Sequence, residues 1–353
     1  MHWFIVPDLD GPPSGGTQYN RMLIAAANEA GVPCTALGRA AAPTVLARGT
    51  AGDMFWVDSL FLDDFAALAA RVWSGTRVGL LAHYLPSLLA AGEELRLAQL
   101  TLAERVALQT ASHFLVPSHF MAAVIRRLAG DGPPIVCVEP GRASAGAVRL
   151  PDPPVRALMV ANLVPGKGVA SFLAALAEHI TEADDFALRV VGGFGRDPPY
   201  AQRCVELAGD PRLRGRVELA GELSPADTLG AMAASNLLIS ASGMESYGMA
   251  LAEARGLGLP IVARAGGNVR NLIEVVAGGE LVTDEAELAV ACLRLAREPP
   301  RLRRRLVQAH AHALPPRSWA DAAREFASQL AEARALMAAA FLAGERRPHA
   351  GSA

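Results

Sequence analysis

Residues 236–263 have the sequence NLLISASGMESYGMALAEARGLGLPIVA, and this stretch decides the fold. Its apolar start, 236–241, predicts a strand, and the Ala- and Leu-rich residues up to Glu253 predict a helix. Glycine and proline then end the helix, and Ile-Val-Ala at 261–263 predicts a second buried strand. A helix that follows a strand in this way presents free N–H groups and the positive end of its dipole, here near residues 247–249. The junction is therefore suited to an anion or a sugar phosphate.

Two glutamates, Glu245 and Glu253, flank this expected helix start. In a helix that began at Glu245, their separation would bring the two carboxylates within about 80° of each other. They would then bracket one elongated ligand. Acidic residues are also common near helix starts because they offset the dipole, so the spacing alone does not separate a ligand site from ordinary helix stabilisation. The glycine-containing turn and the small apolar residues between the pair favour the ligand site.

Strand-like and helix-like segments alternate along the whole chain. The alternation predicts α/β domains with parallel sheets covered by helices on both faces. We expect a first domain at 1–150, a second domain at 151–314, a last helix within 315–345 and a disordered tail at 346–353. The expected strands are 3–6, 53–57, 78–83, 114–116, 135–138, 157–160, 187–191, 217–219 and 236–241. The expected helices are 18–30, 63–73, 88–108, 119–128, 169–179, 200–207, 225–234 and 319–343.

The glutamate pair and the residues after it resemble a known family. Glu-x7-Glu followed by Ala-Arg-Gly-Leu-Gly-Leu-Pro-Ile-Val-Ala is similar to the donor-sugar motif of retaining glycosyltransferases of the GT-B fold, family four (group one) in particular. Weaker similarity at 115–121, 139–141, 191–193 and 217–221 extends the resemblance over nearly the whole chain. It implies two Rossmann-like domains that face a deep interdomain cleft. The first domain would be the acceptor side, the second would bind the nucleotide sugar, and the last helix would cross back to the first domain.

Two loops at strand-to-helix junctions are candidates for phosphate binding. Gly15-Gly16 lies where the first strand leads into a helix, and glycines there let a phosphate or sugar approach the backbone. A plain flexible loop is an equally good interpretation of these two residues alone. The Gly-x-Gly-x-x-Gly pattern of a dinucleotide site is missing, which argues against an NAD-dependent oxidoreductase. In the resembling family, a Gly-Gly loop lines the donor cleft.

The segment 160–169 resembles the family stretch whose Arg and Lys hold the donor diphosphate. Lys167 matches the Lys, whereas Asn162 stands where the Arg is usual. His83 ends an expected strand; from the sequence alone it is more often a structural residue, but the family places a His there beside the donor sugar. The resemblance thus implies that Glu245 holds a sugar hydroxyl, that Glu253 holds the ribose, and that His83 positions the sugar.

The candidate site residues form two sets. The candidate catalytic residues are His83, Lys167 and Glu245. The candidate donor-binding residues are Gly15, Gly16, Asn162, Gly193, Leu223, Tyr247, Gly248, Met249, Ala250, Leu251 and Glu253. In the family's proposed route, the acceptor attacks from the face that the phosphate leaves, and the departing phosphate takes its proton. That route needs no protein base, no metal and no other cofactor.

Composition excludes several other classes. The chain has 353 residues, of which 52% are hydrophobic and 19% charged, with a formal net charge of −2, so a general polyanion binder is not expected. The arginine cluster at 301–305 fits a solvated helix face better than a nucleic-acid surface. Four scattered cysteines favour a reducing cytoplasm. His310 and His312, two apart on an expected helix, point to different faces and imply no metal. No segment has the features of a signal peptide or a membrane span.

Three functions stay open at this stage. The leading one is a cytoplasmic retaining hexosyltransferase that uses a nucleotide-diphosphate sugar and a small molecule, a glycan or a lipid-linked sugar as acceptor. The second is another GT-B enzyme, such as a sugar-nucleotide epimerase or a phosphorylase. The third is a catalytically idle relative that binds a nucleotide, and Asn162 is the main argument for it. Arg126 and Arg127 are too few basic residues on one helix to predict membrane docking.

Overall fold

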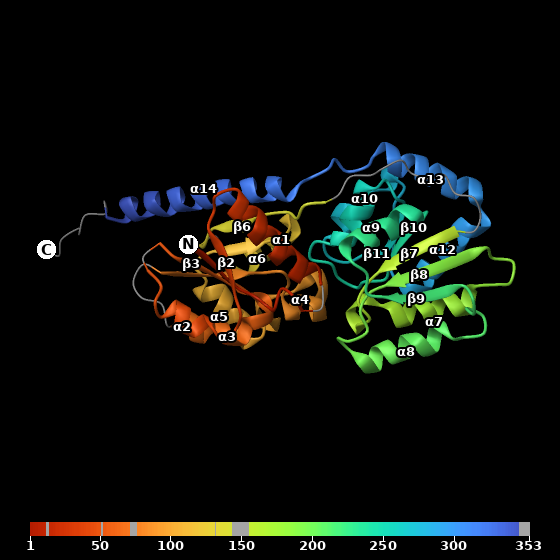
Figure 1. Ribbon diagram of the computed structural model, residues 1–353, viewed down its shortest axis with the longest axis horizontal. Coiled ribbons are helices and arrows are strands. Elements are labelled where there is room, and N and C mark those ends of the chain that lie inside the picture. Colours follow the sequence, from red (N-terminus) through yellow and green to blue (C-terminus); the bar gives the residue numbers. More distant parts are fainter. Residues whose placement is uncertain (12–13, 51, 71–75, 131, 143–154, 346–353) are drawn as a thin grey trace.

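The computed structural model describes residues 1–11, 14–50, 52–70, 76–130, 132–142 and 155–345, with side chains as far as residue 336. The described residues form two six-stranded sheets, and helices cover both faces of each (Figure 1). The strands pair in parallel throughout both sheets. The predicted doubly wound α/β class is therefore confirmed. The expected boundary at 150/151 and the tail at 346–353 lie outside the described residues.

The first sheet has the strand order β2-β1-β3-β4-β5-β6. Its strands are β1 (His2–Ile5), β2 (Cys34–Leu37), β3 (Met54–Asp58), β4 (Arg77–Leu81), β5 (Phe114–Val116) and β6 (Ile135–Cys137). Its helices are α1 (Gly15–Glu29), α2 (Ala42–Leu46), α3 (Leu62–Ala69), α4 (Pro86–Ala91), α5 (Leu102–Thr110), α6 (His119–Ala129) and α14 (Trp319–Glu345). We call this unit the first domain. The edge strand β2 and the short helix α2 were not predicted.

The second sheet has the order β12-β11-β10-β7-β8-β9, and we call it with its helices the second domain. Its strands are β7 (Val155–Val160), β8 (Phe186–Val191), β9 (Val217–Gly221), β10 (Leu237–Ser240), β11 (Ile261–Arg264) and β12 (Glu280–Val282). Its helices are α7 (Val169–His179), α8 (Pro198–Ala208), α9 (Pro225–Ala234), α10 (Met249–Gly256), α11 (Val269–Leu272), α12 (Glu285–Arg297) and α13 (Pro299–Ala311).

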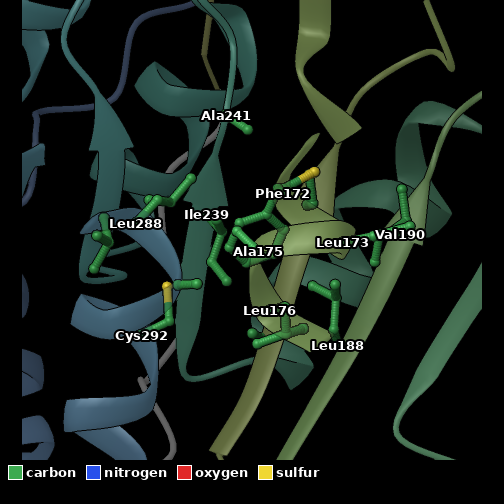
Figure 2. Close-up of a cluster of buried hydrophobic side chains, with 14 of the residues drawn as sticks. Phe172, Leu173, Ala175, Leu176, Leu188, Val190, Ile239, Ala241, Leu288 and Cys292 are labelled. Carbon is green, nitrogen blue, oxygen red and sulfur yellow. The ribbon is translucent and has the colours of Figure 1, made fainter. Parts of the chain in front are cut away.

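Alternating side chains on each strand build a separate core on each face of each sheet. On β7, Met159 packs with α7 and α12, whereas its neighbour Leu158 faces the core shared with α9 and α10. Figure 2 shows the first of these cores, where Phe172 and Leu176 of α7 meet Ile239 of β10. The strands of a sheet that is buried on both faces must be almost continuously apolar. Such apolar runs could be recognised in the sequence of this sheet.

The prediction of a single helix at 88–108 was wrong. The chain forms α4, two 3-10 turns (Gly92–Glu94 and Leu97–Gln99) and α5 instead. Gly92 ends α4 with φ 71°, a left-handed value that continues no helix. Thr101 then starts α5 with a capping box: its hydroxyl accepts a hydrogen bond from the Glu104 amide, and the Glu104 carboxylate accepts one from the Thr101 amide. Glu104 is fully buried and also accepts a bond from the Ser87 amide, which ties α5 to α4.

Helix α14 packs on the first domain although it follows the second in sequence (Figure 1). Its residues Ala322 and Phe326 are fully buried in the core that also contains Tyr19 of α1 and Trp56 of β3. The Gln329 side chain continues the sheet edge, since it donates to the Cys137 carbonyl and accepts from the Cys137 amide, both at 2.7 Å. Within the part of the chain that the structure describes, none of the helices combines the length and apolar composition needed to span a membrane.

Candidate active site

A cavity of about 530 Å³ lies where the carboxyl ends of the strands of both sheets face each other. It is lined by loops that follow β1, β3 and β4 of the first domain and β7, β8, β9 and β10 of the second. Ligands of open α/β sheets bind at this edge. Every candidate residue except Gly193 lines the cavity: Gly15, Gly16, His83, Asn162, Lys167, Leu223, Glu245, Tyr247, Gly248, Met249, Ala250, Leu251 and Glu253.

Glu245 and Lys167 form an ion pair across two loops of the second domain, with 2.5 Å between the carboxylate Oε1 and Nζ. Lys167 is the only lysine in the sequence. Its ammonium side chain is one-third exposed, and the Glu245 side chain is 17% exposed. The backbone of Glu245 is fixed by a bridge to Gly267 and by the Asn268 amide, which donates to the Glu245 carbonyl at 2.8 Å.

The helix start expected near residues 247–249 is confirmed, so the angle calculated for a helix that begins at Glu245 does not apply. Helix α10 begins at Met249, and Gly248 before it has φ 86°, outside the helical range. The preceding carbonyls are bonded elsewhere: Ser118 Oγ donates to the carbonyl of Ser246, and Asn268 Nδ2 donates to that of Tyr247. These bonds hold residues 245–247 as a loop. The two glutamates thus share the cavity because of this loop and not because of helical periodicity.

The start of α10 presents backbone donors to the cavity. The cap residue is a glycine, and no side chain among the described residues caps the helix. Residues 249–251 line the cavity, so the unpaired amides of the first turn face it together with the positive end of the helix dipole. This arrangement can accept a phosphate.

Glu253 of α10 is partly buried and lines the cavity. Burial raises the pKa of its carboxyl from 4.5 to about 7. Among the described residues, none forms a hydrogen bond or ion pair with this carboxyl. A ligand that brings hydroxyl donors would supply the missing partners, and it would also favour the ionised form.

His83 follows β4 and is held by a buried polar chain that the sequence did not reveal. Its Nε2 lies 2.8 Å from Asn20 Oδ1, and Asn20 Nδ2 donates to Asp58 Oδ2 at 2.9 Å. Asp58 Oδ2 is also 3.6 Å from His83 Nε2. Burial lowers the pKa of His83, and the charge of Asp58 opposes that shift. A neutral imidazole that donates from Nε2 to Asn20 fits these contacts.

The side chain of Asn162 connects two loops of the second domain. Its Oδ1 accepts a hydrogen bond from the Gly193 amide at 2.9 Å, which places Gly193 just behind the cavity wall. The adjacent Gly192 packs so closely that a Cβ would lie 1.9 Å from the Ala161 carbonyl oxygen. The loops after β7 and β8 are therefore locked together by backbone contact.

Further polar residues line the cavity without having been predicted, among them Asp58, Arg196, Glu222 and Thr228. Asp58 ends β3, and His83 follows the neighbouring strand β4, so the rule that ligand residues follow parallel strands could have identified Asp58. Arg196 and Glu222 lie in loops and carry no comparable signal. No group of three or more His, Cys, Asp or Glu residues with metal-ligand geometry occurs in the described ranges.

Solved structures with the same arrangement of two domains identify the fold class of the chain. Sucrose-phosphate synthase from Thermosynechococcus elongatus superposes with a TM-score of 0.71 over 96% of this chain and 99% of that one, at 18% sequence identity. The Anabaena protein HepE in complex with UDP-glucose superposes with a TM-score of 0.71 over 94% and 99%, at 17% identity. The chain thus has the GT-B fold.

Sequence comparison adds a family match. Residues 142–312 match the family described as Glycosyl transferases group 1. A curated relative, alpha-monoglucosyldiacylglycerol synthase of Streptococcus pneumoniae, is 31% identical over 127 residues, which are 36% of this chain. The match spans only 28% of that relative's length.

Proposed function

We propose that the protein is a retaining hexosyltransferase that moves a sugar from a nucleotide-diphosphate sugar to an acceptor hydroxyl. The observation that carries the proposal is the meeting of Lys167, Glu245, Glu253 and His83 with the start of α10 in one cavity between two sheets. The match of residues 142–312 to the family of group 1 glycosyl transferases supports the same class of reaction. The neighbour HepE was solved with UDP-glucose, which makes UDP-glucose the first donor to test.

The positive groups of the site suit a leaving diphosphate. Cleavage of a sugar–phosphate bond leaves negative charge on the phosphate oxygens and creates an oxocarbenium-like centre on the sugar. In the proposal, the Lys167 ammonium, the amides of Gly15-Gly16 and those at the start of α10 stabilise the diphosphate. Because Lys167 is paired with Glu245 before ligand binds, an arriving diphosphate shares the ammonium with this carboxylate.

The acidic groups suit the sugars of the donor. Glu253 accepts hydrogen bonds from the ribose hydroxyls, and Glu245 accepts one from a hydroxyl of the transferred sugar. His83 lies on the opposite, first-domain wall and positions that sugar. The acceptor approaches from the first-domain side, attacks the anomeric carbon on the face that the diphosphate leaves, and gives its proton to the departing phosphate oxygen. The new bond therefore keeps the anomeric configuration of the donor.

The single lysine offers a direct test of donor binding. Reductive methylation with ¹³C-formaldehyde labels only Lys167 and the N-terminal amine, and a Lys167→Arg variant identifies the Lys167 signal. We expect UDP, GDP or ADP, or one of their sugars, to shift this signal and to raise the melting temperature. A signal that no nucleoside diphosphate moves, with an unchanged melting temperature, would contradict the proposal.

Transfer is then tested with the donor that binds. A small polyol, an oligosaccharide and a diacylglycerol serve as acceptors, the last because of the name of the curated relative. ³¹P NMR follows release of the nucleoside diphosphate. Nucleotide binding with no transfer to any acceptor class would favour the catalytically idle alternative. Appearance of an epimerised donor or a sugar 1-phosphate would identify an epimerase or a phosphorylase.

A further inference from the structure

The charges that line the cavity indicate that diphosphate binding needs a second cationic side chain besides Lys167. Among the residues that the structure describes, its lining contains four carboxylates, those of Asp58, Glu222, Glu245 and Glu253, against the basic side chains of Lys167 and Arg196. Lys167 is already paired with Glu245. A diphosphate that enters this acidic cavity needs more positive charge than a shared ammonium provides.

Arg196 is held close to the phosphate-side loops by its own backbone. Three residues before it, the Gly193 amide donates to Asn162 Oδ1, and Gly192 packs directly on the Ala161 carbonyl. One residue after it, Asp197 caps α8 by accepting a hydrogen bond from the Tyr200 amide at 3.0 Å. Arg196 therefore sits on a short segment fixed at both ends, in the loop after β8, next to the β7 loop that carries Lys167.

A structural role at the helix start does not explain this arginine. Arg196 directly precedes the N-cap of α8, where the helix dipole is positive and a cation is unfavourable. Its side chain is exposed and lines the cavity. An anion in the cavity would offset both the dipole and the guanidinium charge.

We propose that Arg196 is the second cationic ligand of the donor diphosphate and takes the place of the basic side chain that Asn162 does not provide. Asn162 contributes indirectly, because its bond to Gly193 fixes the loop that presents Arg196. The guanidinium can donate two hydrogen bonds to phosphate oxygens, which a point charge such as Lys167 does not reproduce. This inference rests on the proposed function, because it assigns a residue to the same donor site.

The test compares ligands that differ only in their phosphates. UDP, GDP and ADP are titrated into the parent protein by calorimetry, and the tightest is then compared with its monophosphate and its nucleoside. Arg196→Ala should weaken the diphosphate about tenfold and leave the nucleoside within about twofold. Its affinity for the diphosphate should also depend less steeply on salt concentration. Arg203→Ala is the matched control, since Arg203 is exposed on α8 and does not line the cavity.

The outcomes separate the inference from the proposed function. Equal diphosphate affinity in Arg196→Ala and the parent overturns the inference and leaves the proposed function standing. An equal loss for nucleoside and diphosphate also overturns it, because Arg196 would then act on the base or the ribose. A parent that binds none of the three diphosphates overturns both. Selective loss of diphosphate affinity, absent from Arg203→Ala, supports the assignment.

Discussion

Glu253 provides a quantitative test of the site, because its carboxyl is partly buried and has no hydrogen-bond or ion-pair partner among the described residues. Ionising a group whose pKa rises from 4.5 to about 7 costs about 3 kcal/mol more in the folded protein than in the unfolded chain. The folded protein holds this proton to higher pH than the unfolded chain does, so stability falls as the pH rises from 4.5 to about 7. Above that range the full cost applies.

Replacement of Glu253 by Gln removes the ionisation and keeps the size of the side chain. We expect Glu253→Gln to be more stable than the parent by about 3 kcal/mol at pH 8 and by less than about 1 kcal/mol at pH 5. Urea denaturation at the two pH values measures this difference. Glu178→Gln, an exposed change on α7, should stay within about 0.5 kcal/mol of the parent at both. A gain for Glu253→Gln that is the same at pH 5 and pH 8 would refute the reasoning.

The same carboxyl links donor binding to pH. If ribose hydroxyls donate to ionised Glu253, binding near pH 6.5 must release a proton, and affinity must increase as the pH rises through 7. Calorimetry in buffers of different ionisation enthalpy detects the released proton. Glu253→Gln should bind the nucleotide more weakly at pH 8, by about 1.5–3 kcal/mol, and should release no proton. Proton uptake on binding to the parent would exclude this role of Glu253.

Three further predictions concern other parts of the site. Asp58→Asn removes the charge that opposes the effect of burial, so the pKa of His83 should fall further below its ordinary value in an NMR titration; an increase would contradict the proposed polar chain. Gly192→Ala brings a Cβ to 1.9 Å from the Ala161 carbonyl and should destabilise the protein by about 3 kcal/mol in urea, whereas Gly195→Ala, with open space around it, should be neutral. An α-linked donor should give an α-linked product, with activity retained in EDTA; a β-linked product by NMR anomeric coupling would reject the retaining mechanism.

The fold was predictable because its signal is local and repeated. Buried parallel strands such as β7, β8 and β10 are mostly apolar runs, and helices such as α7 and α9 were predicted with the bounds that the structure has. The helix predicted at 88–108 failed where one residue changes the backbone direction. Gly92 ends α4, because its positive φ overrides a sequence that otherwise favours helix.

The site was predictable only in part, because tertiary contacts assemble the rest. Glu245, Lys167 and His83 belong to recognisable local patterns at strand ends. Asp58 ends a strand and could have been identified by the same rule, whereas Asn20 looks like an ordinary residue of a helix and is identifiable only when α1, β3 and β4 are brought together. The bond from Asn162 to Gly193 likewise joins residues whose sequence separation hides the contact.

The position of α14 has a consequence for the order in which the protein is made. The first sheet leaves the ribosome early, but Phe4 and Trp56 lack part of their packing until Phe326 follows. The whole second domain is synthesised in between. The nascent first domain must therefore persist with an open apolar face while its neighbour folds, and chaperone binding or aggregation during synthesis should concentrate on that face. A translation arrest placed before residue 319 would hold the first domain in this incomplete state. Continued synthesis of the remaining residues would then allow α14 to cover the open face.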